Sequence, residues 1–357
     1  MLQISVSELK ANPGKYVAMA EDQDIFITKN GRVAARIVSA RVDKVAVARS
    51  LFGILPADAD FFLWVSFPDP HHPCDPPKSE IGRHDWRSLA LPDSCPKTAE
   101  AARKILADKP RHWLDWYEGR LVTNFEAPPD FVPSSVTLDQ LREIQALIHV
   151  ENELIDEACA SVWDTIKARG WADDTDVVFT TDHGELQGDF GLLFKGPYHV
   201  DALMRLPMIW RPARSARAAA TRVAEPVGQV DLAPTFCSIA GLPVPDWMQG
   251  QPLPLSAADA SAQKREHVLT EWDSEFKGIT VHLRTIYREC FVCTAYEKSS
   301  LYDGSEGELY DLRNDPHQWR NLWNEPAQRR RRDEMVADLY RNLPPARSPK
   351  LEAVASV

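Results

Sequence analysis

A long amphipathic segment followed by a short apolar one constrains the fold of this 357-residue chain more than any other feature. Between Thr137 and Gly170, apolar residues recur with helical spacing, Thr137-x-x-Gln140 forms a capping-box pattern, and Gly170 is a typical helix terminator. Residues 176–180 (DVVFT) then predict a strand buried on both faces. Because a helix leading into a buried strand is typical of βαβ units, the sequence predicts an α/β fold.

Polar side chains with useful chemistry follow this predicted strand directly. Asp182 and His183 offer a carboxylate oxygen and an imidazole nitrogen, a pair that suits a divalent metal, and Gly184 lets the backbone approach an ion closely. A metal needs about four to six ligands, so further ligands must come from elsewhere. An Asp-His-Gly sequence alone could be an ordinary turn. The glycine-rich segment 188–197 favours a site, because its Lys195 suits a tetrahedral oxyanion.

A second apolar run, residues 61–67 (FFLWVSF), predicts another strand buried on both faces. The proline-rich turn at residues 68–73 follows it and places His71 and His72 at the carboxyl end of the strand. Ligands of open α/β sheets bind at that end, so both histidines are candidate site residues.

The N-terminal residues predict a small separate unit. Ser5-x-x-Glu8 is a capping-box pattern that opens a helix running to about Met19. Two strands follow, at residues 24–29 and 32–38, joined by an Asn30-Gly31 turn. Such a unit buries little apolar area, so we expect it to dimerise or to pack on something else.

Composition excludes several classes of protein. The chain is 44% hydrophobic and 26% charged, which is typical of a globular protein, and its net charge of −11 argues against a general nucleic-acid binder. No apolar run is long enough to span a membrane, and residues 1–8 lack the features of a secretory signal. Six cysteines in a chain of this length do not suggest a disulfide framework, so we expect a cytoplasmic protein.

Five segments in order resemble the sulfatase family of the alkaline-phosphatase-like superfamily, over about residues 61–345. They are residues 61–77, 154–175, 177–210 (VVFTTDHGELQGDFGLLFKGPYHVDALMRLPMIW), 230–253 and 307–322. The resemblance implies an incomplete α/β sulfatase sandwich at residues 60–265 and a small antiparallel C-terminal subdomain at residues 266–357.

The sulfatase resemblance implies metal-dependent hydrolysis of sulfate esters, as in an arylsulfatase. Asp182 and His183 would be ligands of a divalent metal (Ca²⁺, or Mg²⁺ or Mn²⁺), and Lys195 would hold a sulfate oxygen. His71 would contact the sulfate or protonate the leaving oxygen, with His72 as the weaker candidate. A phosphate or phosphonate ester is an alternative substrate, since it presents a similar tetrahedral anion.

Two parts of the family's catalytic site have no match before residue 61. The family nucleophile is a formylglycine made from Cys or Ser in C/S-x-P-S-R, and two adjacent aspartates supply further metal ligands. Cys74 stands in the sequence Cys-Asp-Pro-Pro-Lys, which resembles the motif only in part, and no amphipathic helix follows it; we therefore predict that it is not a nucleophile. The resemblance thus predicts impaired activity, in a pseudoenzyme or the product of a gene fusion.

Residues 1–59 resemble antitoxins of the Phd/YefM family, through ISVSELKANPGKYV and DIFITKNGRVAARIV. This resemblance implies a homodimer that binds operator DNA or a toxin. The segment carries eight basic and six acidic residues, a net charge of +2 that supports DNA binding only weakly. The rival interpretation of the whole chain is therefore a DNA- or toxin-binding regulator with a passenger sulfatase fragment.

Two smaller patterns predict structure instead of function. Cys290 and Cys293 have CxxC spacing inside a strand-like run at residues 284–294, without a second pair, so we interpret them as core cysteines and not as a zinc or redox site. Asp231 precedes a helix whose Leu232, Phe236 and Ile239 are expected to pack inward.

Overall fold

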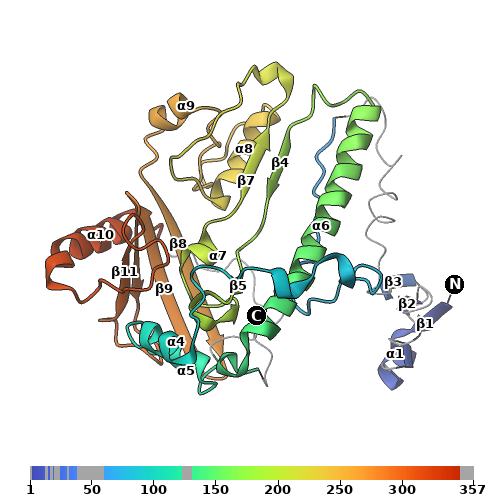
Figure 1. Ribbon diagram of the computed structural model, residues 1–357. Helices are drawn as coiled ribbons and strands as arrows, with labels where there is room; N and C mark the ends of the chain where they lie inside the picture. The colour runs from blue at the N-terminus through green and yellow to red at the C-terminus, as the bar shows by residue number, and fades with distance from the viewer. Residues whose placement is uncertain are drawn as a thin grey trace. The chain divides into compact units, whose positions relative to one another are not determined.

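The structure is a computed structural model (Figure 1). It describes residues 2–12, 15–16, 19, 25–29, 32–37, 60–122 and 131–345. Its contacts divide the chain into two compact units. The first consists of Met1–His71 and Glu151–Gly170, and the second of His72–Val150 and Trp171–Val357. None of the described helices is long and apolar enough to cross a membrane.

The first unit contains a three-stranded sheet. Its elements are β1 (Leu2–Ser5), α1 (Val6–Ala11), β2 (Ile25–Lys29) and β3 (Arg32–Ile37). Strand β2 pairs parallel with β1 and antiparallel with β3, and Ile4, Ile25 and Ile27 form its core. The parallel strand β1 was not predicted, because four residues are too few to show a periodicity.

The predicted capping box is present at the start of α1. The Ser5 N–H donates to Glu8 Oε2 over 2.7 Å, and the Glu8 N–H donates to Ser5 Oγ over 3.2 Å. Helix α1 ends at Ala11, although the described residues Lys15, Tyr16 and Met19 within the predicted range are again helical. Asn12 leaves the helical conformation (φ −146°, ψ 64°), as expected of the residue before a proline. The predicted Asn30-Gly31 turn lies outside the described residues.

The prediction of a buried strand at residues 61–67 is wrong. The structure assigns no strand there, and the side chains of Phe62 and Trp64 are each 66% exposed. No strand among the described residues pairs with this run, and an apolar run forms a buried strand only where other strands flank it.

The long helix is confirmed as α6 (Leu138–Ala168). Its predicted capping box is present, since the Thr137 N–H donates to Gln140 Oε1 over 2.9 Å and the Gln140 N–H donates to Thr137 Oγ1 over 3.2 Å. Gly170 follows with a positive φ of 76°, which a glycine adopts without strain.

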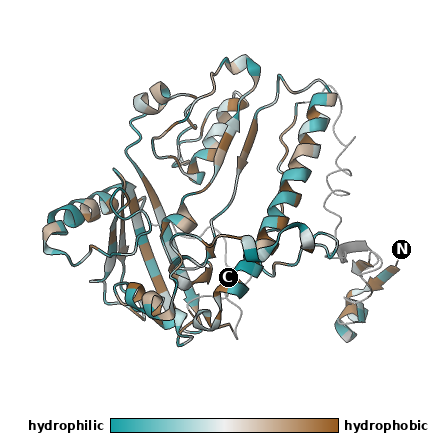
Figure 2. Ribbon diagram, in the orientation of Figure 1, coloured by the Kyte–Doolittle hydropathy of each residue, from teal (hydrophilic) through white to brown (hydrophobic). Residues whose placement is uncertain are grey.

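The predicted strand after α6 is present, but its pairing and burial differ from the prediction. Strand β4 (Val177–Thr180) pairs antiparallel with β7 (Met208–Arg211) and has no parallel partner among the described strands, so the βαβ arrangement expected around α6 and β4 is not found there. Phe179 and Ile209, which face each other across this ribbon, are 44% and 62% exposed. Figure 2 shows β4 as largely hydrophobic. The apolar run therefore predicted the strand correctly and its burial wrongly.

The C-terminal residues form an antiparallel sheet as predicted (Figure 1), whereas their separation as a subdomain stays a prediction. The strands of this sheet lie in the order β11-β10-β9-β8, and α10 (Arg329–Asn342) packs against β9 and β10. The strands are β8 (His267–Phe276), β9 (Ile279–Arg288), β10 (Phe291–Tyr296) and β11 (Gly307–Asp311). The prediction of one continuous strand at residues 284–294 is wrong. Glu289 and Cys290 form a turn within this range, with φ of 53° and 64°.

Shorter elements complete the second unit. The helices are α4 (Ala99–Leu106), α5 (His112–Tyr117), α7 (Asp201–Met204), α8 (Leu232–Ile239) and α9 (Ala257–Ala262), and the remaining hairpin consists of β5 (Leu186–Gln187) and β6 (Leu193–Phe194). Single 3₁₀ turns lie at Ile81–Arg83, Trp86–Ser88, Pro133–Ser135, Asp189–Gly191, Arg214–Ala216, Gln229–Asp231 and Pro326–Gln328. In α8 Leu232 is buried as predicted, whereas Ile239 is 42% exposed and the prediction that it packs inward is wrong.

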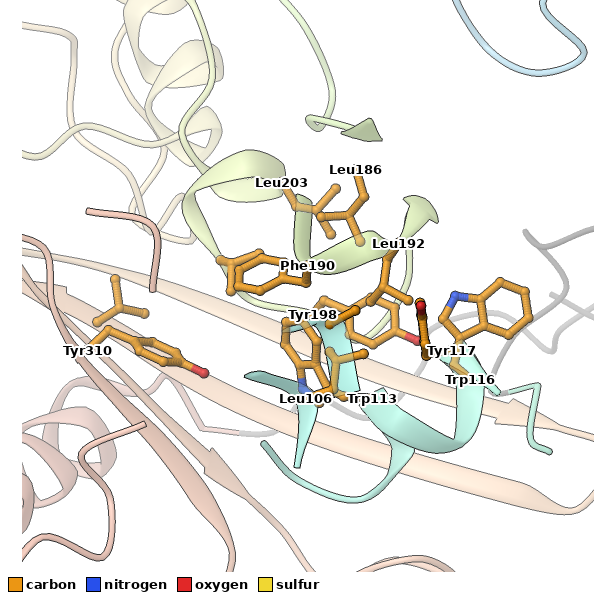
Figure 3. Close-up of a cluster of buried hydrophobic side chains, with 13 residues drawn as sticks. Leu106, Trp113, Trp116, Tyr117, Leu186, Phe190, Leu192, Tyr198, Leu203 and Tyr310 are labelled. Atoms are coloured by element: carbon orange, nitrogen blue, oxygen red, sulfur yellow. The ribbon is translucent and has the colours of Figure 1, made fainter. Parts of the chain in front are cut away.

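The main core of the second unit is aromatic (Figure 3). Trp113 and Tyr117 of α5 pack there with Phe190 and Tyr198, which flank the predicted anion-binding Lys195 in the sequence. The glycine-rich segment is thus part of the core of this unit and not a surface loop.

Candidate active site

Strand β4 ends at Thr180, two residues before the first of the two predicted metal ligands. The His183 N–H donates to Asp182 Oδ1 over 2.9 Å, and His183 Nε2 lies 3.5 Å from Asp182 Oδ2. The Asp182 side chain is 82% exposed and that of His183 is 39% exposed. The carboxylate and the imidazole therefore lie together at the end of the strand and are exposed to solvent.

The hydrogen bond on the other side of the imidazole fixes which nitrogen can bind a cation. His183 Nδ1 lies 2.8 Å from the Gly184 carbonyl oxygen. Because a carbonyl only accepts, Nδ1 carries the hydrogen, and in the neutral ring Nε2 presents a lone pair toward the Asp182 carboxylate. A metal cation between these two atoms would be attracted by both of them. A backbone carbonyl that orients the imidazole in this way is common at metal sites.

The backbone around this pair is held by contacts that the sequence did not predict. Gln229 Nε2 donates to the carbonyl oxygens of Thr181 (2.6 Å) and Asp182 (2.8 Å). The Gly184 N–H donates to the Leu203 carbonyl over 2.9 Å, and a Cβ at Gly184 would lie 1.9 Å from a neighbouring backbone oxygen. Gly184 is therefore required by close packing. Gln229 lies far from the pair in the sequence, and no local pattern marks it.

The local environment keeps Asp182 ionised. Burial raises the pKa of its carboxyl, but the positive charge that the His183 ring carries when protonated, the His183 N–H and the Thr181 hydroxyl outweigh burial, and the net effect lowers the pKa below its usual value. An ionised carboxylate at neutral pH is the form that binds a metal.

The segment that carries Lys195 has an unusual backbone conformation on both sides of the lysine, and hydrogen bonds fix its start. Phe194 and Gly196, on either side of Lys195, both have positive φ, at 69° and 156°. At the start of the segment, Asp189 accepts hydrogen bonds from the Ser94 hydroxyl and from the Gln187 N–H. Lys195 itself is half-buried. Such a conformation persists only where the surroundings determine it.

The two candidate histidines lie in different units. The imidazole of His72 packs on the Phe194 ring, with the centroids 4.8 Å apart, so the structure brings it next to the Lys195 segment. His71 belongs to the first unit, where it is exposed and its N–H donates to the Pro68 carbonyl over 3.3 Å. The role expected of His71 in the site therefore stays a prediction.

The other candidate residues add no further ligand. Across the described residues, no group of three or more His, Cys, Asp or Glu side chains could hold a metal ion. The Asp-His pair fits a metal by its chemistry, but it is only part of a ligand set. Cys74 is half-buried. Cys95, a second cysteine that stands next to a proline in the sequence, is a buried thiol whose pKa is raised by burial, so it is a poor nucleophile.

Asp231 has a structural role. Its carboxylate lies 2.7 Å from Arg265 with both side chains buried, and it accepts from the N–H groups of Gly228 and Gln251. The two cysteines of the CxxC pattern are likewise structural: Cys293 is buried in β10, which raises its pKa to about 12, and Cys290 lies in the turn before it.

Comparison with known proteins matches most of the chain to one family. A family model described as "Sulfatase" matches residues 12–242, and one described as "N-sulphoglucosamine sulphohydrolase, C-terminal" matches residues 188–343. The first match begins inside the segment that resembles an antitoxin. The antitoxin resemblance therefore stays a prediction, as do the domain boundaries drawn from it.

Individual relatives agree with the family models. The uncharacterized sulfatase YidJ of Escherichia coli (strain K12) is 28% identical over 266 residues, which are 74% of this chain and 47% of that protein. An arylsulfatase of Clostridium perfringens is 23% identical over 286 residues, 79% of this chain and 53% of that protein. The crystal structure of a phosphonate monoester hydrolase of Agrobacterium radiobacter has the same fold, with a TM-score of 0.70 and 23% identity over 84% of this chain and 59% of that one.

The chain spans about half the length of these curated relatives. The match to the sulfatase model nevertheless covers well over half of this chain, including Asp182, His183 and Lys195. The chain belongs to the sulfatase family.

Proposed function

We propose that this chain carries part of a sulfate-ester hydrolase site. In it Asp182 and His183 would hold a divalent metal, and Lys195 would bind an oxygen of the sulfate group. The observation that carries the proposal is the Asp182–His183 pair, whose carboxylate and Nε2 atom lie 3.5 Å apart at the solvent-exposed end of β4. When bound, the metal would supply positive charge that stabilises the anion and the developing negative charge on its oxygens.

The remaining side chains have distinct roles in this proposal. The Lys195 ammonium contributes a point charge and hydrogen-bond donation to the tetrahedral anion. His71 or His72 contacts the sulfate or protonates the leaving oxygen. Two facts support including His72: it lies in the same unit as Lys195, and it packs against the neighbouring Phe194.

We further propose that this chain by itself binds metal and anion but turns over slowly. The sequence contains no C/S-x-P-S-R motif from which a formylglycine nucleophile could be made. Groups of a catalytic site act as a unit, so losing the nucleophile removes most of the rate while binding survives.

A titration with inorganic sulfate, followed by calorimetry, tests the proposed role of Lys195. A charge-assisted hydrogen bond contributes about 1.5–3 kcal/mol, so Lys195→Ala should weaken sulfate binding by roughly 10- to 100-fold. Lys104→Ala is the matched control, because Lys104 is an exposed lysine of the same unit, and its affinity should equal that of the unaltered protein. Equal affinities of all three proteins would contradict the proposal.

A turnover assay distinguishes the substrate classes. The proposal predicts slow hydrolysis of 4-nitrophenyl sulfate that Asp182→Asn reduces further. Rapid hydrolysis of this ester would contradict the proposed slow turnover. Faster hydrolysis of 4-nitrophenyl phenylphosphonate than of the sulfate would favour the phosphonate alternative, which the fold shared with a phosphonate monoester hydrolase brings into consideration.

A further inference from the structure

A fully buried histidine, His112, contacts the segment that follows Lys195. It is the first residue of α5 and has no exposed surface. Its Nε2 atom lies 3.0 Å from the Pro197 carbonyl oxygen, two residues after Lys195. Pro197 has no N–H, so this carbonyl is the only polar group of its backbone.

The hydrogen bonds of His112 require one tautomer. Because the Pro197 carbonyl only accepts, Nε2 carries the hydrogen and Nδ1 accepts from the Tyr302 hydroxyl, 2.5 Å away. The same hydroxyl accepts from the His112 backbone N–H over 3.1 Å. Every polar group of the His112 ring and of the Tyr302 hydroxyl is thereby used, and the imidazole cannot rotate without losing one of these bonds.

Packing reinforces this orientation. The His112 ring stacks on Tyr198, the residue after Pro197, with centroids 5.1 Å apart and an interplanar angle of 18°. Tyr198 in turn packs edge-on against Trp113, at 4.6 Å, as Figure 3 shows. Residues 196–200 are all buried. His112 thus contacts the buried segment through a hydrogen bond and through a ring face.

Burial keeps His112 uncharged. It lowers the pKa of the imidazole to about 3, so the ring remains in the neutral tautomer that donates to Pro197 at any physiological pH. His199, farther along the segment, is buried in the same way, and its Nδ1 lies 2.6 Å from Thr285 Oγ1 of β9. The segment after Lys195 is therefore fixed at two points.

We propose that His112 is a positioning residue for Lys195: its Nε2–H holds the Pro197 carbonyl and so fixes the backbone that presents the lysine to the anion. This inference rests on the proposed role of Lys195. His112 does not touch the substrate in this proposal and acts only through the segment.

Two substitutions separate the hydrogen bond from the volume of the ring. His112→Phe keeps an aromatic ring but removes both the donor to Pro197 and the acceptor for Tyr302, whereas His112→Gln retains one donor and one acceptor. The control is Tyr296→Phe, which removes two other buried hydrogen bonds near His112, the 2.5 Å bond to Glu308 and the 3.4 Å bond from Trp113 Nε1, and none to residues 195–200.

Hydrogen exchange of the 195–200 backbone, followed by mass spectrometry, reads the positioning directly. His112→Phe should raise exchange in this segment at least tenfold, His112→Gln should restore most of the protection, and Tyr296→Phe should leave it unchanged. Unchanged exchange in His112→Phe, or equal changes in His112→Phe and Tyr296→Phe, would overturn the inference. If His112→Phe does not fold, Tyr302→Phe takes its place with the same expectations, because it removes the hydroxyl that orients the ring.

The affinity for inorganic sulfate shows whether the positioning serves Lys195. His112→Phe should weaken binding about tenfold and His112→Gln should recover it to within about threefold, with Tyr296→Phe unchanged. Faster hydrogen exchange of the 195–200 backbone in His112→Phe, together with an unaltered affinity for sulfate, would overturn the inference. The proposed function is tested separately, by Lys195→Ala. It fails if that variant binds sulfate as tightly as the unaltered protein.

Discussion

At the scale of single residues, a buried lysine outside the proposed site shows how its surroundings change the pKa of a side chain. Lys109 is 7% exposed, and its Nζ donates to the Tyr310 hydroxyl over 2.7 Å and to the Gln318 carbonyl. The ammonium also lies over the rings of Trp113, Phe190 and Tyr310. Burial lowers the pKa of Lys109 to about 8, against a partial compensation from the buried Glu308 carboxylate.

This lowered pKa predicts a specific pH dependence of stability. The unfolded lysine has a pKa near 10.4, so between about pH 8 and 10 the unfolded chain holds a proton that the folded chain has lost. The contribution of Lys109 to the free energy of unfolding should therefore rise with pH across this window, by up to a few kcal/mol. We expect the free energy of unfolding of the unaltered protein minus that of Lys109→Met, measured by denaturant unfolding, to increase from pH 7.5 to 10.

An exposed lysine serves as the control for this measurement. Lys104→Met, in α4, should show a difference that does not depend on pH. A flat difference for Lys109→Met as well would show that the folded and unfolded states bind this proton equally.

At the scale of elements, features that depend on neighbouring residues, such as helix caps, were predicted well. The burial of strands, which depends on distant parts of the chain, was not. The capping boxes at Ser5 and Thr137 are confirmed because both partners lie within four residues. The burial of the runs at 61–67 and 176–180 depends on partner strands, which a run's own residues do not specify. The turn inside 284–294 was missed because its residues, Glu and Cys, are unusual where both φ values are positive.

That turn leads to a prediction with an internal comparison. The β8–β9 hairpin turns through Lys277-Gly278 and the β9–β10 hairpin through Glu289-Cys290, with positive φ at all four residues. Only glycine adopts this conformation without strain, so Cys290→Gly should raise the free energy of unfolding by about 1 kcal/mol. Gly278→Ala should lower it by a similar amount, since a Cβ there would meet no atom within 4 Å and only the backbone conformation changes.

Thermal or denaturant unfolding of both variants measures this effect. A Cys290→Gly protein less stable than the parent would mean that the cysteine side chain, which accepts a weak hydrogen bond from the Tyr287 hydroxyl, outweighs the backbone strain.

At the scale of the whole molecule, the sequence predicted one part of the candidate site and missed the residues that hold it. Asp182, His183 and Lys195 stand in recognisable patterns at a strand end and in a glycine-rich segment. Gln229, Ser94 and His112 contact these segments from 47 to 95 residues away along the chain, and nothing around them in the sequence marks that contact. Supporting residues of this kind become visible only once the fold is known.

The metal site is the central claim of this account, and ligand-dependent thermal unfolding tests it most directly. A metal that binds only the folded state stabilises it by mass action, by about 2.7 kcal/mol at 100 times its Kd. We therefore predict that Ca²⁺, Mg²⁺ or Mn²⁺ raises the unfolding midpoint by several degrees, and that Asp182→Asn and His183→Ala each abolish the shift. Asp174→Asn, which removes the same charge at an exposed position before β4, should retain it. No shift with any of the three metals, or a full shift in Asp182→Asn, would contradict the account.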